Sequence, residues 1–210
     1  MSATTRWDEV DYVVVDVEGN GARPPDLVEV ATVPVRGGVV GQPRVWLVRP
    51  PAAITWQARK IHGISNDDVA NAPTIGTVAA EITAALGDAI PVGHAVHVDL
   101  DVLHRSLPTW DHPTALDTLK LARRAFDLES YKLAALVEHR HLGADLPAGM
   151  RAHRADYDAL ITARLFVDLA SGFAPGGAAL DDLINAASSG KRGGAKPAAE
   201  DEAATLFELP

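Results

Sequence analysis

The chain of 210 residues contains no cysteine. Disulfide bridges, thiolate zinc sites and cysteine nucleophiles are therefore excluded, and the composition agrees with a reducing, cytoplasmic location. No apolar run approaches the roughly 18 residues that a membrane-spanning helix needs, and the polar first ten residues do not resemble a signal peptide. We expect a soluble protein with no membrane partner.

Positive charge is also scarce, with 19 Lys and Arg against 28 Asp and Glu and a formal net charge of −9. Surfaces that bind nucleic acid are usually rich in Lys and Arg, so this balance argues mildly against a high-affinity duplex binder. Bound divalent ions reverse the local charge of acidic groups, which weakens the objection. Local positive charge is available near two motifs described below, from Arg105, Arg123, Arg124, Lys132, Arg151 and Arg154.

Three segments rich in β-branched residues open the chain. They predict antiparallel strands at 12–18, 27–36 and 39–48, with Gly37-Gly38 as a hairpin turn between the second and third. Two short apolar segments, 89–92 and 114–116, predict further strands.

Helical periodicity begins at Ile75 and predicts an amphipathic helix that ends at Gly87. Further helices are predicted to carry Leu100 to Leu107, Leu119 to Phe126, Leu133 to Val137 with Ser130 as N-cap, and 156 to 170. Antiparallel strands followed by alternating helices and strands predict an α/β domain with one mixed sheet, spanning residues 1–173.

Composition changes after Phe173, where Pro, Gly, Ala, Ser and charged residues dominate. We expect a short helix at 178–187 within a disordered tail, residues 174–210. The apolar end, 204–210, is a candidate docking peptide for a polymerase or sliding clamp, although it lacks the Gln common in clamp-binding peptides. An uninvolved terminus is the simpler interpretation.

The feature that indicates function is a pair of acids at the end of the first predicted strand. Asp16 and Glu18 follow the β-branched run Val13-Val14-Val15. Because side chains alternate along a strand, both carboxylates project from the same face, one pleat apart. Two like charges on a mostly apolar strand are costly unless a cation neutralises them, and a hard divalent metal ion is one remedy. A solvated strand end without metal is the simpler alternative at this point.

Two later segments raise the case for metal chemistry: Gly93-His94, with Asp99 five residues after that His, and His153-Arg154-Ala155-Asp156-Tyr157-Asp158-Ala159. Together with Asp-x-Glu, this ordered set resembles that of the DEDDh exonucleases, which include bacterial proofreading epsilon subunits, ribonuclease T and oligoribonuclease. The resemblance covers roughly residues 10 to 172. Four connecting phrases also look like the family: Ile61-His62-Gly63-Ile64, Asn71-Ala72-Pro73, Asp117-Thr118-Leu119 and Tyr131-Lys132-Leu133.

This resemblance implies a ribonuclease H-like fold and a metal-dependent 3′–5′ exonuclease. Asp16, Glu18, Asp99 and Asp158 would then surround two Mg²⁺ or Mn²⁺ ions, which such sites hold about 3.5–4 Å apart. His153 would be the general base that takes a proton from the attacking water.

The implied partner is a nucleic acid with a free 3′ end, from which nucleoside monophosphates are released. Single-stranded DNA ends are the favoured substrate, and an exoribonuclease acting on short RNA is the alternative. A catalytically silent nucleic-acid-binding scaffold is the competing class. The complete set of four acids and one histidine argues against it, because a binding module does not need clustered, desolvated carboxylates.

Spacing decides where two of these residues lie. Five helical steps of about 100° separate His153 from Asp158, so the two side chains cannot share a helical face. His153 is therefore predicted to lie in the approach to the last core helix, with Asp158 in its first turns. The same geometry turns Asp99 and Asp101 about 200° apart, and the motif spacing selects Asp99.

The chain also departs from the family pattern. Many relatives follow the first-motif Glu with Thr-Thr-Gly, where this chain has Gly19-Asn20-Gly21, and the usual Asn after Gly-His is Ala95. The common Phe before the second-motif Asp is Val98. These positions lie near the terminal nucleotide in relatives, so we expect weaker hold on the substrate rather than loss of the reaction.

Other constellations favour different chemistry only weakly. Gly19-Asn20-Gly21 begins like a dinucleotide-binding loop, but Pro24 occupies the place of the third glycine. A zinc site is an alternative for His94 and His97 with Asp99 and Asp101, but no matching carboxylate-histidine shell follows in the sequence. The four tryptophans are too scattered to form a stacking platform, although Trp56 precedes Ile61-His62-Gly63 and is a candidate contact with nucleic acid.

Overall fold

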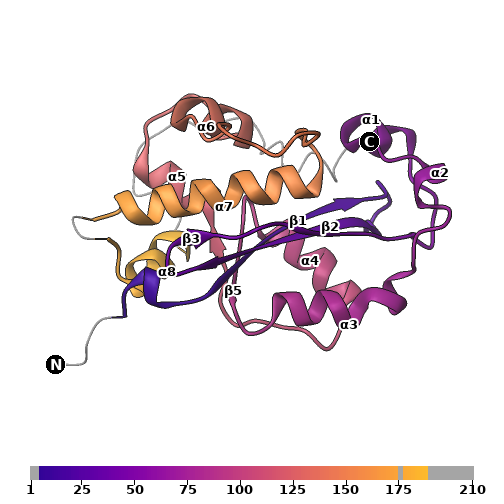
Figure 1. The fold of residues 1–210 in the computed structure, drawn as a ribbon, viewed down its shortest axis with the longest axis horizontal. Coiled ribbons are helices and arrows are strands. Elements are labelled where there is room, and N and C mark those ends of the chain that lie inside the picture. The colour runs from indigo at the N-terminus through magenta and orange to yellow at the C-terminus, as the bar shows by residue number, and fades with distance from the viewer. Residues whose placement is uncertain (1–4, 175–176, 189–210) are drawn as a thin grey trace.

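A computed structural model describes residues 5–174 and 177–188. A mixed sheet forms the centre of the molecule (Figure 1), with strand order β3-β2-β1-β5-β6 and β4 paired with β2. β1 runs antiparallel to β2 and parallel to β5, which in turn runs parallel to β6. The strands are β1 (Tyr12–Gly19), β2 (Leu27–Arg36), β3 (Val39–Val40), β4 (Arg44–Leu47), β5 (Ile90–Gly93) and β6 (Leu116–Asp117).

Helices cover both faces of this sheet. Figure 1 shows α7 lying along one face, with α5 and α6 beyond it, while α3 and α4 lie on the opposite face. The helices are α1 (Trp56–His62), α2 (Asn66–Val69), α3 (Ile75–Leu86), α4 (His97–Ser106), α5 (Thr118–Ala125), α6 (Leu133–Arg140), α7 (Ala155–Gly172) and α8 (Leu180–Ser188). A single 3₁₀ turn, η1, spans Trp7–Glu9.

Alternation along β1 divides its side chains between two apolar cores. Val13, Val15 and Val17 pack in the core on the α3–α4 side. Tyr12 and Val14 pack in the core on the α7 side. Even-numbered positions of β1 therefore face α7, and this periodicity directs the carboxylates at 16 and 18 toward the same helix.

The N-terminal and C-terminal parts of the described chain meet at one edge of the α7-side core. The N–H of Trp7 donates to the carbonyl of Ala178 (3.1 Å), and the N–H of Leu180 donates to that of Thr5 (3.0 Å). Leu183 of α8 is fully buried in the same core as Tyr12 and Phe166. α8 is thus packed against the first elements of the chain.

The predicted α/β mixed-sheet fold is confirmed, and so are the helix ending at Gly87 and the short helix after residue 178. The predicted strand at 39–48 is wrong in its continuity, because it divides into β3 and β4. The N–H of Gly41 still donates to the carbonyl of Pro34 in the register of β3, but β4 pairs with β2 in a register shifted by one residue, so the pairing is interrupted between Gly41 and Arg44. The predicted Ser130 N-cap is also wrong: α6 begins after Lys132 and has no side-chain cap.

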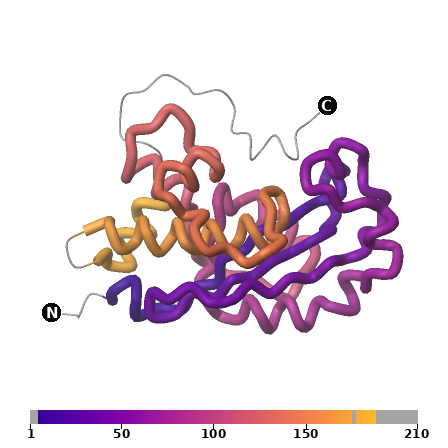
Figure 2. The backbone as a smooth tube through the Cα atoms, turned by 45° about the horizontal axis from the view of Figure 1, so that its top comes forward, coloured from indigo at the N-terminus to yellow at the C-terminus, as the bar shows by residue number. Residues whose placement is uncertain are grey.

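Two short helices, α1 and α2, were not predicted. They stand beyond the end of β1, at the same end of the molecule as the start of α7, and Figure 2 shows the same arrangement from a second direction. Within the described ranges no helix is long and apolar enough to cross a membrane. The candidate docking peptide at 204–210 lies outside the described residues.

Candidate active site

Three of the predicted metal ligands come together where β1 meets α7. Asp16 and Glu18 project from the end of β1, and Asp158 comes from the first turn of α7. Each offers a carboxylate oxygen, and these oxygens all lie within 4.8 Å of one another. β1 reaches this point because its β-branched run is buried on both faces and pairs with β2 and β5.

Asp99, the fourth predicted ligand, lies next to this trio but belongs to α4. It is buried, and its Oδ1 accepts a hydrogen bond from the N–H of Val17 at 3.0 Å. Asp101 is exposed instead, and its carboxylate pairs with Arg105 four residues later at 2.8 Å. The choice of Asp99 over Asp101 agrees with this geometry.

Charge repulsion and burial act together on these carboxyls. Burial, then the neighbouring acids Asp158 and Asp99, raises the pKa of Asp16 well above its usual range. Burial and the charge of Asp158 also raise the pKa of Glu18. Burial raises the pKa of Asp99 to about 8 and that of Asp158 to about 7, although backbone N–H groups oppose both shifts. The charge of Arg154 opposes the pKa shift at Glu18 but does not reverse it.

The donor set fits a hard divalent cation. All of the converging donors are carboxylate oxygens, which Mg²⁺ and Mn²⁺ prefer, and neither thiolate nor imidazole belongs to the trio. A cation at this point would stabilise the ionised carboxyls that burial and mutual repulsion disfavour. The structure thus shows an acidic cluster suited to metal binding.

His153 lies immediately before α7, as predicted. Its side chain is exposed, its backbone adopts φ +61°, and its N–H donates to Oδ2 of Asp158 at 3.0 Å. A positive φ is uncommon for a residue other than glycine, so the surrounding contacts must hold this conformation. The backbone of His153 therefore contacts the trio through Asp158, while the residue itself precedes the helix.

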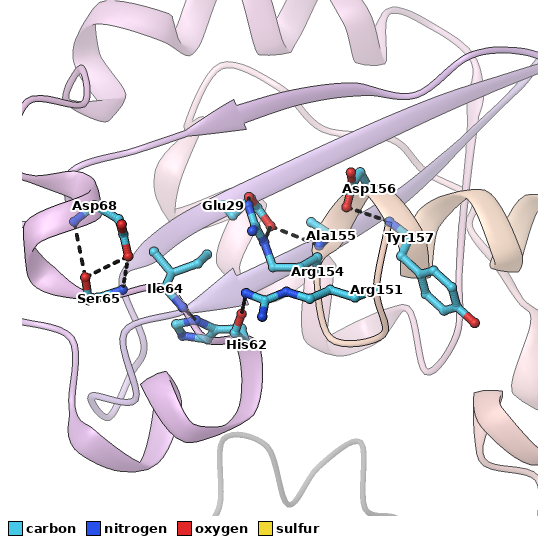
Figure 3. A network of polar contacts seen from close by, with 10 residues as sticks. All are labelled: Glu29, His62, Ile64, Ser65, Asp68, Arg151, Arg154, Ala155, Asp156 and Tyr157. Carbon is cyan, nitrogen blue, oxygen red and sulfur yellow. Dashed lines mark hydrogen bonds and ion pairs between the residues drawn. The ribbon is translucent and has the colours of Figure 1, made fainter. Parts of the chain in front are cut away.

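Glu29 is the polar residue that sequence reasoning missed. It lies on β2 directly opposite Glu18, and only 1% of its surface is exposed. Its carboxylate accepts two hydrogen bonds from the guanidinium of Arg154 and one from the N–H of Ala155 (Figure 3). The available signal was a single Glu within the apolar run Leu27-Val28-Glu29-Val30-Ala31.

These residues lie within the region that matches a known family. Residues 13–166 match the model described as RNase_T, Exonuclease. The chain belongs to this exonuclease family. The predicted family and ribonuclease H-like fold are confirmed, and the predicted enzyme class, a 3′–5′ exonuclease that acts as a hydrolase, agrees with this membership.

Individual relatives show the same likeness. The chain is 36% identical to Exodeoxyribonuclease 10 of Escherichia coli over 156 residues, which cover 74% of this chain and 67% of that protein. It is 32% identical to DNA polymerase III subunit epsilon of Aquifex aeolicus over 165 residues, covering 75% and 79%. It spans only 12% of DNA polymerase III PolC-type of Thermotoga maritima, at 30% identity over 174 residues.

One solved structure, Exonuclease X in complex with 5′ overhanging duplex DNA, superposes with a TM-score of 0.70. Its sequence is 32% identical, and the match covers 84% of this chain and 99% of that one.

The second-motif residues His94 and Ala95 of this exonuclease make hydrogen bonds within the fold. His94 is bound through one ring nitrogen to Thr118 and through the other to the carbonyl of Tyr131, each at 2.9 Å. Both nitrogens are therefore occupied, which argues against the zinc alternative. Ala95 has φ +61° and is 2% exposed, and its N–H donates to Asp117. A longer side chain at Ala95 would need space that the neighbouring residues now fill.

The segment Gly19-Asn20-Gly21 makes contacts that hold the start of α1, rather than presenting groups to a ligand. The Asn20 side chain is fully buried; it bonds to Ala22 and Asp26 in its own loop and donates to the carbonyl of Ala52 in the segment before α1. A Cβ added to Gly21, which has φ +78°, would lie 2.2 Å from Oγ1 of Thr55, the N-cap of α1. This loop thus fixes the start of α1 and offers no free amide to a substrate.

Proposed function

We propose that this chain is a metal-dependent exonuclease that hydrolyses phosphodiester bonds from the 3′ end of DNA and releases nucleoside monophosphates. The observation that supports it most directly is the trio of Asp16, Glu18 and Asp158, whose oxygens converge within 4.8 Å beside His153. Its relatives at 30% identity or more include a protein named exodeoxyribonuclease and a DNA polymerase III subunit.

In this proposal Asp16, Glu18, Asp99 and Asp158 hold two Mg²⁺ or Mn²⁺ ions. Bound in this way, such ions make water a stronger nucleophile and stabilise the leaving oxygen. His153 accepts the proton of the attacking water, since a histidine in its neutral form is a suitable base near pH 7. Asp158 holds the backbone N–H of His153, so the base and one metal ligand are joined by a direct hydrogen bond.

Single-stranded 3′ ends are the substrate that we propose. The acidic chain, with a net charge of −9, is unsuited to tight binding of long duplexes through phosphate contacts alone. Trp56 is 68% exposed at the start of α1, and the ammonium of Lys60 lies 4.9 Å from its ring centroid. An exposed aromatic ring beside a cation suits stacking of an unpaired base.

A polymerase or sliding clamp is a further proposed partner. Support for it is limited to the likeness to a polymerase subunit and the apolar sequence at 204–210. Analytical size exclusion of the full chain with a bacterial sliding clamp tests this point. Loss of co-elution after removal of residues 204–210 is the expected result.

The activity is tested with a 5′-labelled single-stranded DNA, an RNA of the same sequence, and a DNA whose 3′ end carries a phosphate. With Mg²⁺ or Mn²⁺ we expect the single-stranded DNA that has a free 3′ end to shorten by one nucleotide at a time from that end. In EDTA we expect no digestion. Faster digestion of the RNA would identify an exoribonuclease, whose discrimination must then involve the 2′-OH. Internal cleavage, or digestion at the wild-type rate by Asp16→Asn, would contradict the proposal.

A further inference from the structure

His153 is held by the contacts of its two neighbouring arginines. Arg154 follows it and binds Glu29 on β2, while Arg151 precedes it and donates from Nη2 to the carbonyl of His62 at 3.3 Å. Figure 3 shows both guanidinium groups reaching from the approach to α7 toward the sheet and α1. The exposed histidine therefore lies on a short span of chain attached on both sides.

The Arg154–Glu29 contact is the stronger of these two attachments. Nε of Arg154 lies 2.9 Å from Oε2 of Glu29, Nη2 contacts Oε1, and the N–H of Ala155 donates to Oε2 at 3.0 Å. The side chain of Glu29 is 1% exposed and that of Arg154 is 31% exposed. Because the planar guanidinium of Arg154 is held at two points, both its distance from Glu29 and its rotation are restricted. A single ammonium contact would restrict only the distance.

Glu29 lies opposite Glu18, and after burial its charge is one of the causes that raise the pKa of Asp16 and Glu18, but its oxygens are engaged outside the acidic trio. Both of its oxygens accept hydrogen bonds from Arg154 or Ala155, and the oxygens of the acidic trio belong to other residues. Glu29 also binds the first N–H of α7, a group that has no partner within the helix. Its contacts thus fix the start of α7 and the residue next to His153.

We propose that the partly buried Glu29–Arg154 pair positions His153 for proton transfer. Glu29 and Arg154 are positioning residues that act through the backbone of 153–155, where His153 has φ +61° and lies between the contacts of Arg151 and Arg154. The inference rests on the proposed function, because it requires His153 to be the base. Small misplacement of a reacting group lowers turnover by about 10²-fold, and we expect a loss of that order when the pair is removed.

The test compares Arg154→Gln and Glu29→Gln with the wild-type chain in steady-state digestion of one single-stranded oligomer. Turnover number, KM and the Mn²⁺ concentration for half-maximal activity are measured for each protein. Each substitution is also made in a His153→Ala background. The matched control is Arg140→Gln, because Arg140 makes an equivalent two-point pair with Asp168 (2.8 and 2.9 Å) near the opposite end of α7.

We expect Arg154→Gln and Glu29→Gln to lower the turnover number while KM and the Mn²⁺ requirement stay near wild type. In the His153→Ala background the same substitutions should have little further effect, because the base they position is already absent. Equal losses in both backgrounds, or a shifted Mn²⁺ requirement, would overturn the proposal. A wild-type turnover number in both variants would do the same.

The variant Arg154→Lys distinguishes a positioning role from a folding defect, because it keeps the charge opposite Glu29 but lacks the planar two-point contact. Circular dichroism verifies its fold, and its turnover number is expected to fall as well; wild-type turnover in Arg154→Lys overturns the proposal. An inactive wild-type protein would instead refute the proposed function. An active wild type that needs His153 but not Arg154 would refute this inference alone.

Discussion

Replacing Asp16 with asparagine should abolish most of the activity and yet stabilise the metal-free protein. The oxygens of Asp16, Glu18 and Asp158 lie within 4.8 Å of one another. Two unit charges at that separation repel by roughly 3.5 kcal/mol at an effective dielectric constant of about 20. Proton uptake relieves part of this repulsion, so we expect a gain of about 1–3 kcal/mol in the free energy of unfolding.

The gain should depend on pH with a defined sign. The folded-state pKa values of these acids are raised, to about 7 for Asp158 and about 8 for Asp99. A raised carboxyl pKa leaves stability intact below the unfolded value, near ~4, and removes it as pH rises toward the folded value. The metal-free wild type should therefore lose stability between about pH 4 and 8. Asp16→Asn should gain least near pH 4 and most near pH 8.

Thermal unfolding in EDTA at several pH values measures this effect, at about 2–4 °C per kcal/mol for a domain of this size. Asp101→Asn is the control, because that carboxylate is exposed and its ion pair with Arg105 contributes little. Adding Mg²⁺ should stabilise the wild type more than Asp16→Asn. A lower melting temperature for Asp16→Asn at pH 8, or a gain that does not vary with pH, would refute the electrostatic account of the site.

Three further outcomes are expected. His153→Ala should retain metal and substrate binding but lose a factor of roughly 10²–10⁴ in turnover number. Its activity should recover partly at high pH, because hydroxide replaces the base. Equal loss of binding and turnover in kinetic assays would indicate a structural histidine. Gly21→Ala should destabilise the fold by about 1–3 kcal/mol in denaturant unfolding, since its φ is +78° and the new Cβ would meet Thr55; an unchanged midpoint would contradict this. Trp56→Ala should raise KM on single-stranded DNA by roughly tenfold, the scale of one lost stacking contact, and leave the melting temperature unchanged; an unchanged KM would exclude stacking.

Local rules predicted the parts of the site that depend on local geometry. Strand alternation placed Asp16 and Glu18 on one face, and helical angles separated Asp99 from Asp101. The position of His153 before α7 followed in the same way. These predictions used residue spacing along a strand or helix, while the choice of Asp99 over Asp101 came from the resemblance to the exonuclease motifs.

Long-range contacts account for what the sequence did not reveal. Glu29 is polar within an apolar strand, but its partner Arg154 lies 125 residues later, and no local pattern connects them. The division into β3 and β4 follows from a one-residue shift in how they pair with β2, which the sequence pattern does not show. Ser130 has a good N-cap side chain, yet α6 begins only after Lys132, because a favourable cap does not by itself fix where a helix starts.

The pairing of residues 5–7 with residues 178–180 also bears on the order in which the chain folds during synthesis. Tyr12 of the first strand packs against Phe166, and Leu183 of the last described helix is buried in the same core. A ribosome releases residues from the N-terminus onward, so β1 and β2 emerge long before these partners exist. The core on the α7 side can close only after nearly all of the described chain has been translated. Until then the apolar face of β1 stays open, and a nascent chain stalled before α7 should be prone to aggregation.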